Sequence, residues 1–423
     1  MNIRSLIRKG LSYASGDGSS TVVNLLVFTL LLRYLSPADF GYLSIGQAVS
    51  SWVQPLLYMG ASLVAVRLIA ARPQDTSVIA QRMIALRIAA AIAVVSCTLL
   101  VALSSSDRSL RAVLLAYSVL FLFYPIQPDF IAIGLNRPRV YSISRWIGAA
   151  CFLSGVLILT RISVRAWMIP LAYAISLIAS AAYGYIALSS ALRGSAGSAT
   201  RLGFGLMFRG AIVVVAAQFF QMGQSAVDVI LLTAWKIPVA AIGDYNAMAR
   251  LTQAGVLPFV ALIYSLAPTY VKQFAAGDSL KIRQLELRFR MCLLLVGVTG
   301  AVMIVAAGPK VLELLSGRKL VSAHRLAPIF ALAYLLVALH NSYTAILVYA
   351  GATHLYLATY ALGLAGTLLA AMVLIPRFGT VGSAWSEVAG FGIILISSYL
   401  FHARLLRHQQ RVSDDPLPVI VGS

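Results

Sequence analysis

The sequence predicts an all-α protein that crosses a membrane many times. Of its 423 residues, 60% are hydrophobic and only 11% are charged, and the mean hydropathy is +0.88. A soluble protein carries about 25% charged residues. Because the deficit extends along the whole chain, the composition indicates a polytopic membrane protein and excludes a soluble domain with a single anchor.

Windows of apolar residues predict roughly twelve membrane helices, each about 20 residues long. The predicted spans are 11–35, 41–66, 83–104, 109–135, 142–161, 166–189, 210–234, 242–268, 289–315, 326–350, 354–376 and 380–403. We therefore expect an N-terminal lobe of six helices over residues 1–192. A second lobe would cover 193–404, and a cytoplasmic tail 405–423.

The net charge of +20 reflects membrane topology, and we expect no nucleic-acid partner. Lys and Arg lie between the apolar segments, where they set orientation and contact anionic lipids. Basic residues number 21 on one set of loops and flanks, counting Arg87, Arg145 and Arg290, against 11 on the other. This excess predicts that both termini are cytoplasmic.

Weak internal similarity indicates a duplication. Pro55 corresponds to Pro258 at an offset of 203 residues, and Trp167 corresponds to Trp385 at 218. The offset rises steadily along the chain, as expected for two copies separated by loop insertions. Because an even number of helices makes both copies enter from the same side, we expect a pseudo-two-fold axis along the membrane normal and a central cavity between the lobes.

Polar residues recur at helical spacing on four of the predicted helices, two from each half. The candidate substrate-binding residues on these faces are Asn24, Gln47, Gln221, Gln224, Asn246 and Gln253. Such residues also join membrane helices by hydrogen bonds, and this reading stays open for any single one. Their paired positions in the two halves favour a solvated cavity.

Arg250 and Asp228 are charged residues within predicted spans. Each costs about 2.5–3.5 kcal/mol at the centre of a membrane helix, so a functional role is the default interpretation. Arg250 would bind an anionic group of a substrate with its planar fork, although an ion pair with Asp228 is the alternative. Asp228 and Asp17 are the candidates for ion coupling or charge balance.

The sequence contains none of the common enzyme or cofactor motifs. We find no P-loop, HExxH motif, CxxC pair or Gly-rich dinucleotide turn, and the five histidines are dispersed. We therefore expect a protein that is not an enzyme and has no metal site and no cofactor. A gradient of H⁺ or Na⁺, the gradient of the substrate itself or a partner would drive transport.

Three segments resemble one known family. Residues 32–42 (LRYLSPADFGY), 242–251 (IGDYNAMARL) and 378–384 (FGTVGSA) are similar to motifs of bacterial polysaccharide flippases. These flippases belong to the multidrug/oligosaccharidyl-lipid/polysaccharide (MOP) exporter superfamily. The family often has a basic residue at the position of Arg250.

The resemblance implies a two-lobed transporter of the bacterial inner membrane that works by alternating access. It would move undecaprenyl-pyrophosphate-linked oligosaccharide repeat units from the cytoplasmic to the periplasmic leaflet. The product would be O-antigen (lipopolysaccharide), capsule or exopolysaccharide. Expected partners are this lipid-linked substrate, membrane lipids, a polysaccharide polymerase and a chain-length regulator.

Three alternatives remain open at this point. One is a cation-coupled drug or small-molecule exporter of the same superfamily, in which Asp17 or Asp228 is the coupling carboxylate. Another is a membrane O-antigen polymerase or ligase, which the short predicted outer loops disfavour. The cost of placing Asp228 and Arg250 in lipid argues against a purely structural protein.

Overall fold

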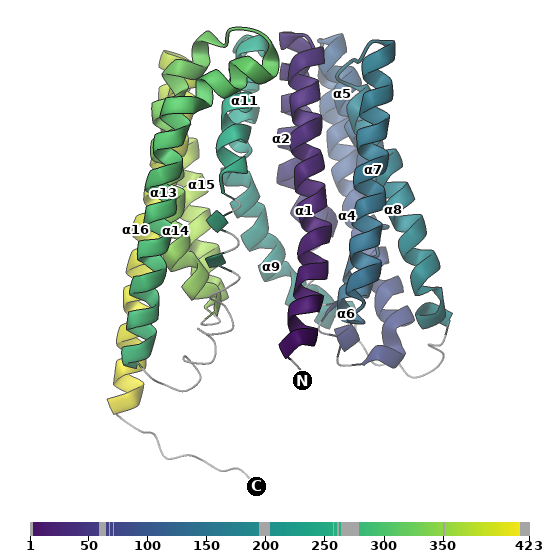
Figure 1. Ribbon diagram of the computed structural model, residues 1–423, viewed down its shortest axis with the longest axis vertical. Coiled ribbons are helices and arrows are strands. Elements are labelled where there is room, and N and C mark those ends of the chain that lie inside the picture. The colour runs from purple at the N-terminus through teal and green to yellow at the C-terminus, as the bar shows by residue number, and fades with distance from the viewer. Residues whose placement is uncertain are drawn as a thin grey trace. The chain divides into compact units, whose positions relative to one another are not determined.

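The computed structural model describes residues 3–58, 65–66, 68–70, 72–193, 204–256, 258–259, 262–263, 279–349 and 352–414. These residues form helices joined by turns, and no β-strand occurs among them (Figure 1). The predicted all-helical class is therefore confirmed. The side chains of some residues within the described helices, including Asp17, lie outside this description.

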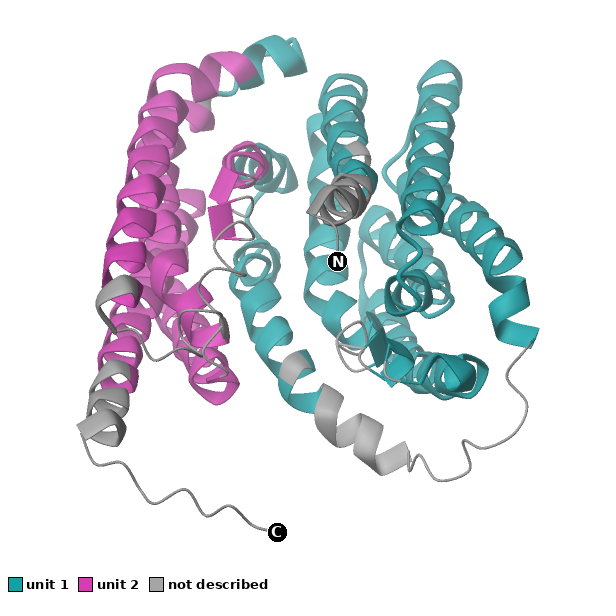
Figure 2. Ribbon diagram, turned by 60° about the horizontal axis from the view of Figure 1, so that its bottom comes forward, with its two compact units in different colours: residues 1–247, 312–320 teal, residues 248–311, 321–423 magenta. Residues whose placement is uncertain are grey.

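The chain forms two compact units (Figure 2). Unit 1 contains Met1–Ala247 and Leu312–Leu320, and unit 2 contains Met248–Val311 and Val321–Ser423. The lobe boundary predicted after residue 192 lies within unit 1. The division into two lobes of six helices thus stays a prediction.

Unit 1 contains most of the helices of the first half of the chain. They are α1 (Ile3–Tyr34), α2 (Pro37–Tyr58), α4 (Thr76–Ser104), α5 (Arg108–Phe121), α6 (Asp129–Gly134), α7 (Pro138–Ile162), α8 (Met168–Arg193), α9 (Phe204–Gln224), α10 (Val227–Ala234) and the first part of α11 (Val239–Ala254). A 3₁₀ turn, Pro73–Asp75, precedes α4. The helix α7 packs against both α1 and α8, and α2 packs against α9.

Two predicted spans are each divided into two helices. The span predicted over 109–135 ends as α5 at Phe121 and resumes as α6 at Asp129, because Pro125 and Pro128 cannot continue the hydrogen-bond ladder. The span predicted over 210–234 bends by 57° between α9 and α10. Gln221 and Gln224 therefore lie on α9, whereas Asp228 lies on α10.

The helices α2 and α11 meet at two glycines of the motifs that carry the family resemblance. A Cβ atom at Gly41 would collide with the carbonyl oxygen of Val239. At Gly243, a Cβ atom would lie 3.0 Å from the carbonyl oxygen of Pro37 and 3.1 Å from the backbone nitrogen of Gly41. Only glycine permits this approach of the two backbones, which gives both motifs a structural reason.

Among the described residues, unit 2 contains the last part of α11 and four long helices. They are α13 (Ser279–Ser316), α14 (Val321–Tyr349), α15 (Thr353–Phe378) and α16 (Thr380–Asp414), apart from the segment of α13 and its loop assigned to unit 1. The helices α15 and α16 form a hairpin at Gly379, whose φ of +58° favours glycine. The helix α14 packs against α16 on this hairpin.

Each of the predicted spans overlaps at least one described helix. Among the described residues, seven helices are long and apolar enough to cross a membrane, or eight if α9 and α10 count as one bent span. The polytopic membrane class is thus confirmed. The total of twelve spans and their pseudo-two-fold symmetry stay predictions.

Candidate functional site

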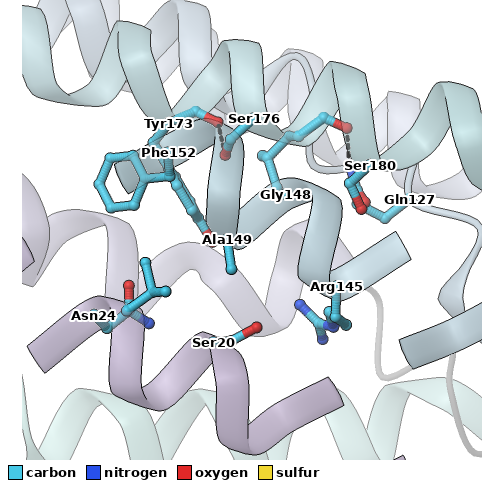
Figure 3. Close-up of a pocket in the computed structure, with 12 residues that line it drawn as sticks. Ser20, Asn24, Gln127, Arg145, Gly148, Ala149, Phe152, Tyr173, Ser176 and Ser180 are labelled. Carbon is cyan, nitrogen blue, oxygen red and sulfur yellow. Dashed lines mark hydrogen bonds between the residues drawn. The ribbon is translucent and has the colours of Figure 1, made fainter. Parts of the chain in front are cut away.

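Unit 1 contains a polar pocket of about 100 Å³ between α1, α7 and α8 (Figure 3). Its lining includes Ser20, Asn24, Gln127, Arg145, Phe152 and Tyr173. Hydroxyl, amide and guanidinium groups thus share a small space with two aromatic rings. The ring centroids of Phe152 and Tyr173 lie 5.0 Å apart in an edge-to-face arrangement.

Small residues and hydrogen bonds hold the three helices around this pocket. The backbone of α7 comes close to α8 at Gly148, where a Cβ atom would lie 3.2 Å from the Cβ of Ser180. The hydroxyl groups of Ser144 and Ser180 lie 2.9 Å apart. On the other side, Trp146 Nε1 donates a hydrogen bond of 3.1 Å to the Ser15 carbonyl of α1.

Arg145 is the charged group of the pocket. Its Nη2 lies 3.3 Å from Asp129 Oδ2, and its guanidinium lies 5.4 Å from the ring centroid of Tyr141. About a third of the Arg145 side chain is exposed, against 15% for Asp129. Arg145 can therefore donate hydrogen bonds from part of its guanidinium group to a ligand, while Asp129 balances its charge.

A second arginine, Arg87 of α4, is buried and contacts the backbone of the pocket residue Gln127. It donates hydrogen bonds to the carbonyls of Gln127 (3.0 Å) and Tyr58 (3.2 Å) and stacks 4.5 Å over the Phe130 ring. The side chain of Gln127 in turn donates to the Leu177 carbonyl at 2.9 Å. Arg87 thus stabilises the break between α5 and α6 and positions Gln127.

Asn24 is the one predicted site residue among those lining this pocket. The other predicted residues of unit 1 whose side chains are described are Gln47, which is half-buried on α2, Gln221 and Gln224 on α9, Asp228 on α10 and Asn246 on α11. Asp17 belongs to α1, but its side chain lies outside the described residues. Their predicted roles in substrate binding and coupling remain predictions.

Two of these residues join helices within unit 1. Asn246 is buried and donates a 2.8 Å hydrogen bond from Nδ2 to Ser44 Oγ of α2. Asp228 is also buried and accepts hydrogen bonds from Tyr245 Oη and from the Val229 backbone. The contact of Asn246 is an interhelical hydrogen bond of the kind that the sequence left open for the amide residues.

Arg250 and Gln253 lie on the last part of α11, which belongs to unit 2. Arg250 is half-buried and Gln253 is exposed. The substrate-binding role of both residues stays a prediction.

Sequence reasoning missed Arg145 and Arg87 because it counted them with the loop and flank charges. Both lie within predicted spans, Arg87 in 83–104 and Arg145 in 142–161. Their positions inside these spans could have identified them as candidate site residues. Asp129, sixteen positions before Arg145 in the chain, is the acidic partner that the same reasoning could have sought.

The sequence model of a family described as polysaccharide biosynthesis protein matches residues 6–274, more than half of the chain. The protein belongs to this family. The matched region begins within α1, extends beyond α11, and includes the pocket and the Gly41–Gly243 contact. No curated protein sequence matches the chain significantly.

Solved structures of MOP superfamily transporters share the fold of this family member. An inward-facing multidrug resistance MATE family transporter has 13% sequence identity and a TM-score of 0.78, with 93% of this chain and 96% of that chain covered. An outward-facing MATE family transporter has 13% identity and a TM-score of 0.66, with 96% of both chains covered.

A third solved structure of this fold is a MOP superfamily transporter from Pyrococcus furiosus, described as having a binding pocket of reverse polarity that suggests a different function. Its identity is 11% and its TM-score is 0.61, and 96% of both chains is covered. The family is thus one of polysaccharide biosynthesis proteins, and the fold is the one that MOP superfamily transporters have.

Proposed function

We propose that this protein is a flippase for undecaprenyl-pyrophosphate-linked oligosaccharide repeat units. It moves them by alternating access from the cytoplasmic to the periplasmic leaflet of a bacterial inner membrane, with both termini in the cytoplasm. Membership of the polysaccharide biosynthesis family supports this proposal. The observation that carries it is the placement of Arg145 in a polar pocket within membrane helices.

The chemistry of the pocket suits a sugar that carries an anionic group. The Arg145 fork matches phosphate or carboxylate oxygens in a bidentate geometry. Asn24 and Ser20 offer hydrogen-bond donors and acceptors for hydroxyl groups. The rings of Phe152 and Tyr173 offer apolar faces, which complement the C–H faces of a sugar ring.

Asp129 gives the pocket a way to bind and release an anion. Its carboxylate balances Arg145 when no substrate is bound, since a partly buried charge without a partner is costly. An entering phosphate competes with Asp129 for the guanidinium, so the net interaction is moderate. A transporter needs such moderate affinity, because its substrate must leave on the other side.

A cation-coupled drug exporter is the second candidate, and the MATE-like fold favours it. Asp17 and Asp228 would then be coupling carboxylates for H⁺ or Na⁺. Arg145 disfavours this candidate for cationic drugs, because a guanidinium in the pocket repels them. An O-antigen polymerase or ligase is disfavoured by the family and the fold, both of which are those of transporters.

A deletion strain of the source bacterium tests the proposal. We expect loss of surface polysaccharide and accumulation of lipid-linked repeat units in the cytoplasmic leaflet, both restored by the intact gene. The polysaccharide polymerase and the chain-length regulator remain expected partners and should be unaffected in amount. Normal surface polysaccharide together with altered drug tolerance would contradict the proposal and favour the exporter.

A further inference from the structure

The pocket of unit 1 is too small to enclose a whole oligosaccharide. Its volume is about 100 Å³, whereas pockets that enclose drug-sized ligands measure about 300–1,000 Å³. It can therefore take only one part of a large ligand. In a lipid-linked oligosaccharide, that part is either the pyrophosphate or a single sugar, and the two differ in charge and in shape.

The two ends of the pocket differ in chemistry (Figure 3). Arg145 lies at one end, and the Phe152 ring and the Asn24 amide lie at the other. Ser20 lies between them. Because Arg145 and Phe152 are two turns apart on α7, their backbones are separated by about 10 Å along the helix axis. A ligand that contacts both ends needs an anionic group on one side and an apolar face on the other.

The aromatic end suits a sugar ring and does not suit a pyrophosphate. The Phe152 ring packs against Tyr173 with 5.0 Å between the ring centroids, and Tyr173 packs against Tyr124 with 6.4 Å. The faces of such rings are electron-rich and attract C–H groups, which a sugar ring has. The Asn24 amide can donate to and accept from sugar hydroxyl groups. A pyrophosphate has neither C–H groups nor hydroxyl groups, so this end would add nothing to its binding.

The charged end suits one negative charge better than two. Among the described residues that line the pocket, Arg145 is the one basic side chain, and its Nη2 lies 3.3 Å from Asp129 Oδ2. The guanidinium of Arg87 donates instead to the backbone carbonyls of Gln127 and Tyr58. A bound carboxylate therefore gives the Arg145–Asp129 pair one excess negative charge. A pyrophosphate diester gives it two, and unbalanced charge is costly in a partly buried site.

We propose that this pocket binds one acidic sugar of the repeat unit, with the carboxylate of a uronic acid on Arg145 and the sugar ring on Phe152. The proposal rests on the proposed flippase function and narrows its substrate to repeat units that contain a carboxylated sugar. A carboxylate matches the guanidinium in a bidentate geometry. A carboxylated sugar thus satisfies both ends of the pocket, whereas a pyrophosphate satisfies the first and a neutral sugar the second.

Saturation-transfer difference NMR on the purified full-length protein tests binding without any transport. The ligands are glucuronate, galacturonate and their uncharged methyl esters, and inorganic pyrophosphate is added as a competitor. We expect at least one acid to bind about 10-fold or more tightly than its ester, since a charged hydrogen bond is lost in the ester. An equal concentration of pyrophosphate should displace little of it. Equal binding of acid and ester, full displacement by pyrophosphate, or no binding of either acid would overturn the proposal.

Variants of α7 assign the binding to the pocket. Arg145→Gln should weaken acid binding by about 10- to 100-fold and leave ester binding unchanged. Phe152→Ala should weaken the binding of acid and ester alike. The matched controls are Arg139→Gln and Leu157→Ala, at exposed positions of the same helix, and both should bind as the wild type does. Wild-type acid binding by Arg145→Gln, at an unchanged unfolding temperature, would overturn the assignment.

Transport separates this proposal from the flippase function on which it rests. Proteoliposomes would carry one of two fluorescently labelled polyprenyl-pyrophosphate oligosaccharides, which differ only in a uronate or its methyl ester. We expect the wild type to flip the acid at least about 10-fold faster than the ester, and Arg145→Gln to lose this difference. Equal flipping of both by the wild type overturns the acidic-sugar proposal and leaves the flippase function standing. If uronate binds but neither lipid is flipped, the flippase function fails and the sugar site stands.

Discussion

Tyr245 donates a hydrogen bond of 2.5 Å to Oδ2 of Asp228, and both side chains are buried in unit 1. The other oxygen of Asp228 accepts from the Val229 backbone at 2.8 Å. The bond joins the start of α10 to α11 just after the bend that separates α9 from α10. A carboxylate with two donors is stabilised in place, so Asp228 holds the broken span to its neighbour.

Replacing Tyr245 by Phe should destabilise the protein, because it removes one donor from a buried carboxylate. We expect a loss of about 1–3 kcal/mol, measured as a lower unfolding temperature in detergent. Tyr34→Phe, at an exposed position, is the matched control and should unfold like the wild type. Equal unfolding temperatures for Tyr245→Phe and the wild type would show that the contact adds nothing.

Replacing Arg145 by Ala should weaken substrate handling by roughly 10- to 100-fold, since charged hydrogen bonds are worth about 1.5–3 kcal/mol. Complementation of the deletion strain, read as surface polysaccharide, measures the effect. Arg145→Lys should keep part of the activity, because lysine retains the positive charge but lacks the planar guanidinium that binds two oxygens at once. Arg139→Ala, at an exposed site of the same helix, is the control. Full activity of Arg145→Ala at normal protein levels would exclude Arg145 from the mechanism.

The predicted role of Arg250 is tested in the same strain. Arg250→Ala should abolish rescue, whereas Arg250→Lys should rescue partially, with both proteins inserted at normal levels. The physical reason is the loss of an anion-binding group from a membrane helix, since the lysine keeps the charge but not the planar geometry. Wild-type polysaccharide in the Arg250→Ala strain would contradict the sequence-based assignment.

Replacing Gly41 by Ala should destabilise unit 1, because the added Cβ collides with the Val239 carbonyl and cannot be relieved without moving a backbone. We expect about 1–3 kcal/mol, the usual cost of overpacking. Gly18→Ala is the matched control, since a Cβ there meets no atom within 4 Å. Protein yield and thermal unfolding report both variants. The steric argument fails if the two alanine variants are equally stable.

Asp107, in the connection before α5, should contribute to the dependence of stability on pH. Burial acts to raise its pKa, but hydrogen bonds from Tyr42 and from the backbone of Leu110 and Ser109 outweigh this and lower the pKa below its ordinary value. A lowered pKa in the folded state means that this stabilisation is present above the ordinary carboxylate pKa. It is lost as the pH falls through the lowered value.

Substitution of Asp107 tests this assignment. Asp107→Ala removes the cap of α5 and should cost about 1 kcal/mol at neutral pH. Thermal unfolding followed from pH 7 down to about pH 3 should show a smaller acid destabilisation than in the wild type. If the unfolding temperatures of the two proteins fall equally as the pH is lowered, Asp107 does not contribute to the acid destabilisation. Asp39→Ala, which removes a second carboxylate of unit 1, is the comparison for general charge effects.

The helices could be predicted from the sequence, because long apolar runs have few alternatives in a membrane. The bend after Gln224 could not, since neither Pro nor a marked change in composition identifies it. The pocket was missed for a different reason. In a sequence, a basic residue near the end of a span that sets the topology looks the same as one that binds a ligand. Only the packing of the helices shows that Arg145 lies beside Asp129 and shares a pocket with Asn24.

The glycine contact between α2 and α11 also could not be predicted from the sequence. Gly41 and Gly243 were recognised as parts of family motifs, but the sequence did not indicate that they touch. Their 202-residue separation is bridged only in the folded unit. Short motifs in a membrane protein can thus mark a close approach of two backbones as well as a binding site.

The break between α9 and α10 interrupts the regular helical ladder at Ser225 and Ala226, whose amides donate instead to the carbonyls of Met222 and Gly223. These carbonyls and amides belong to every amino acid alike. Replacing a residue of this stretch by alanine leaves its peptide group in place. Alanine scanning would therefore find no loss of transport even where the main chain binds the substrate or an ion. Replacing single backbone amides by esters, through protein semisynthesis, removes one peptide N–H at a time and would measure what each contributes to transport.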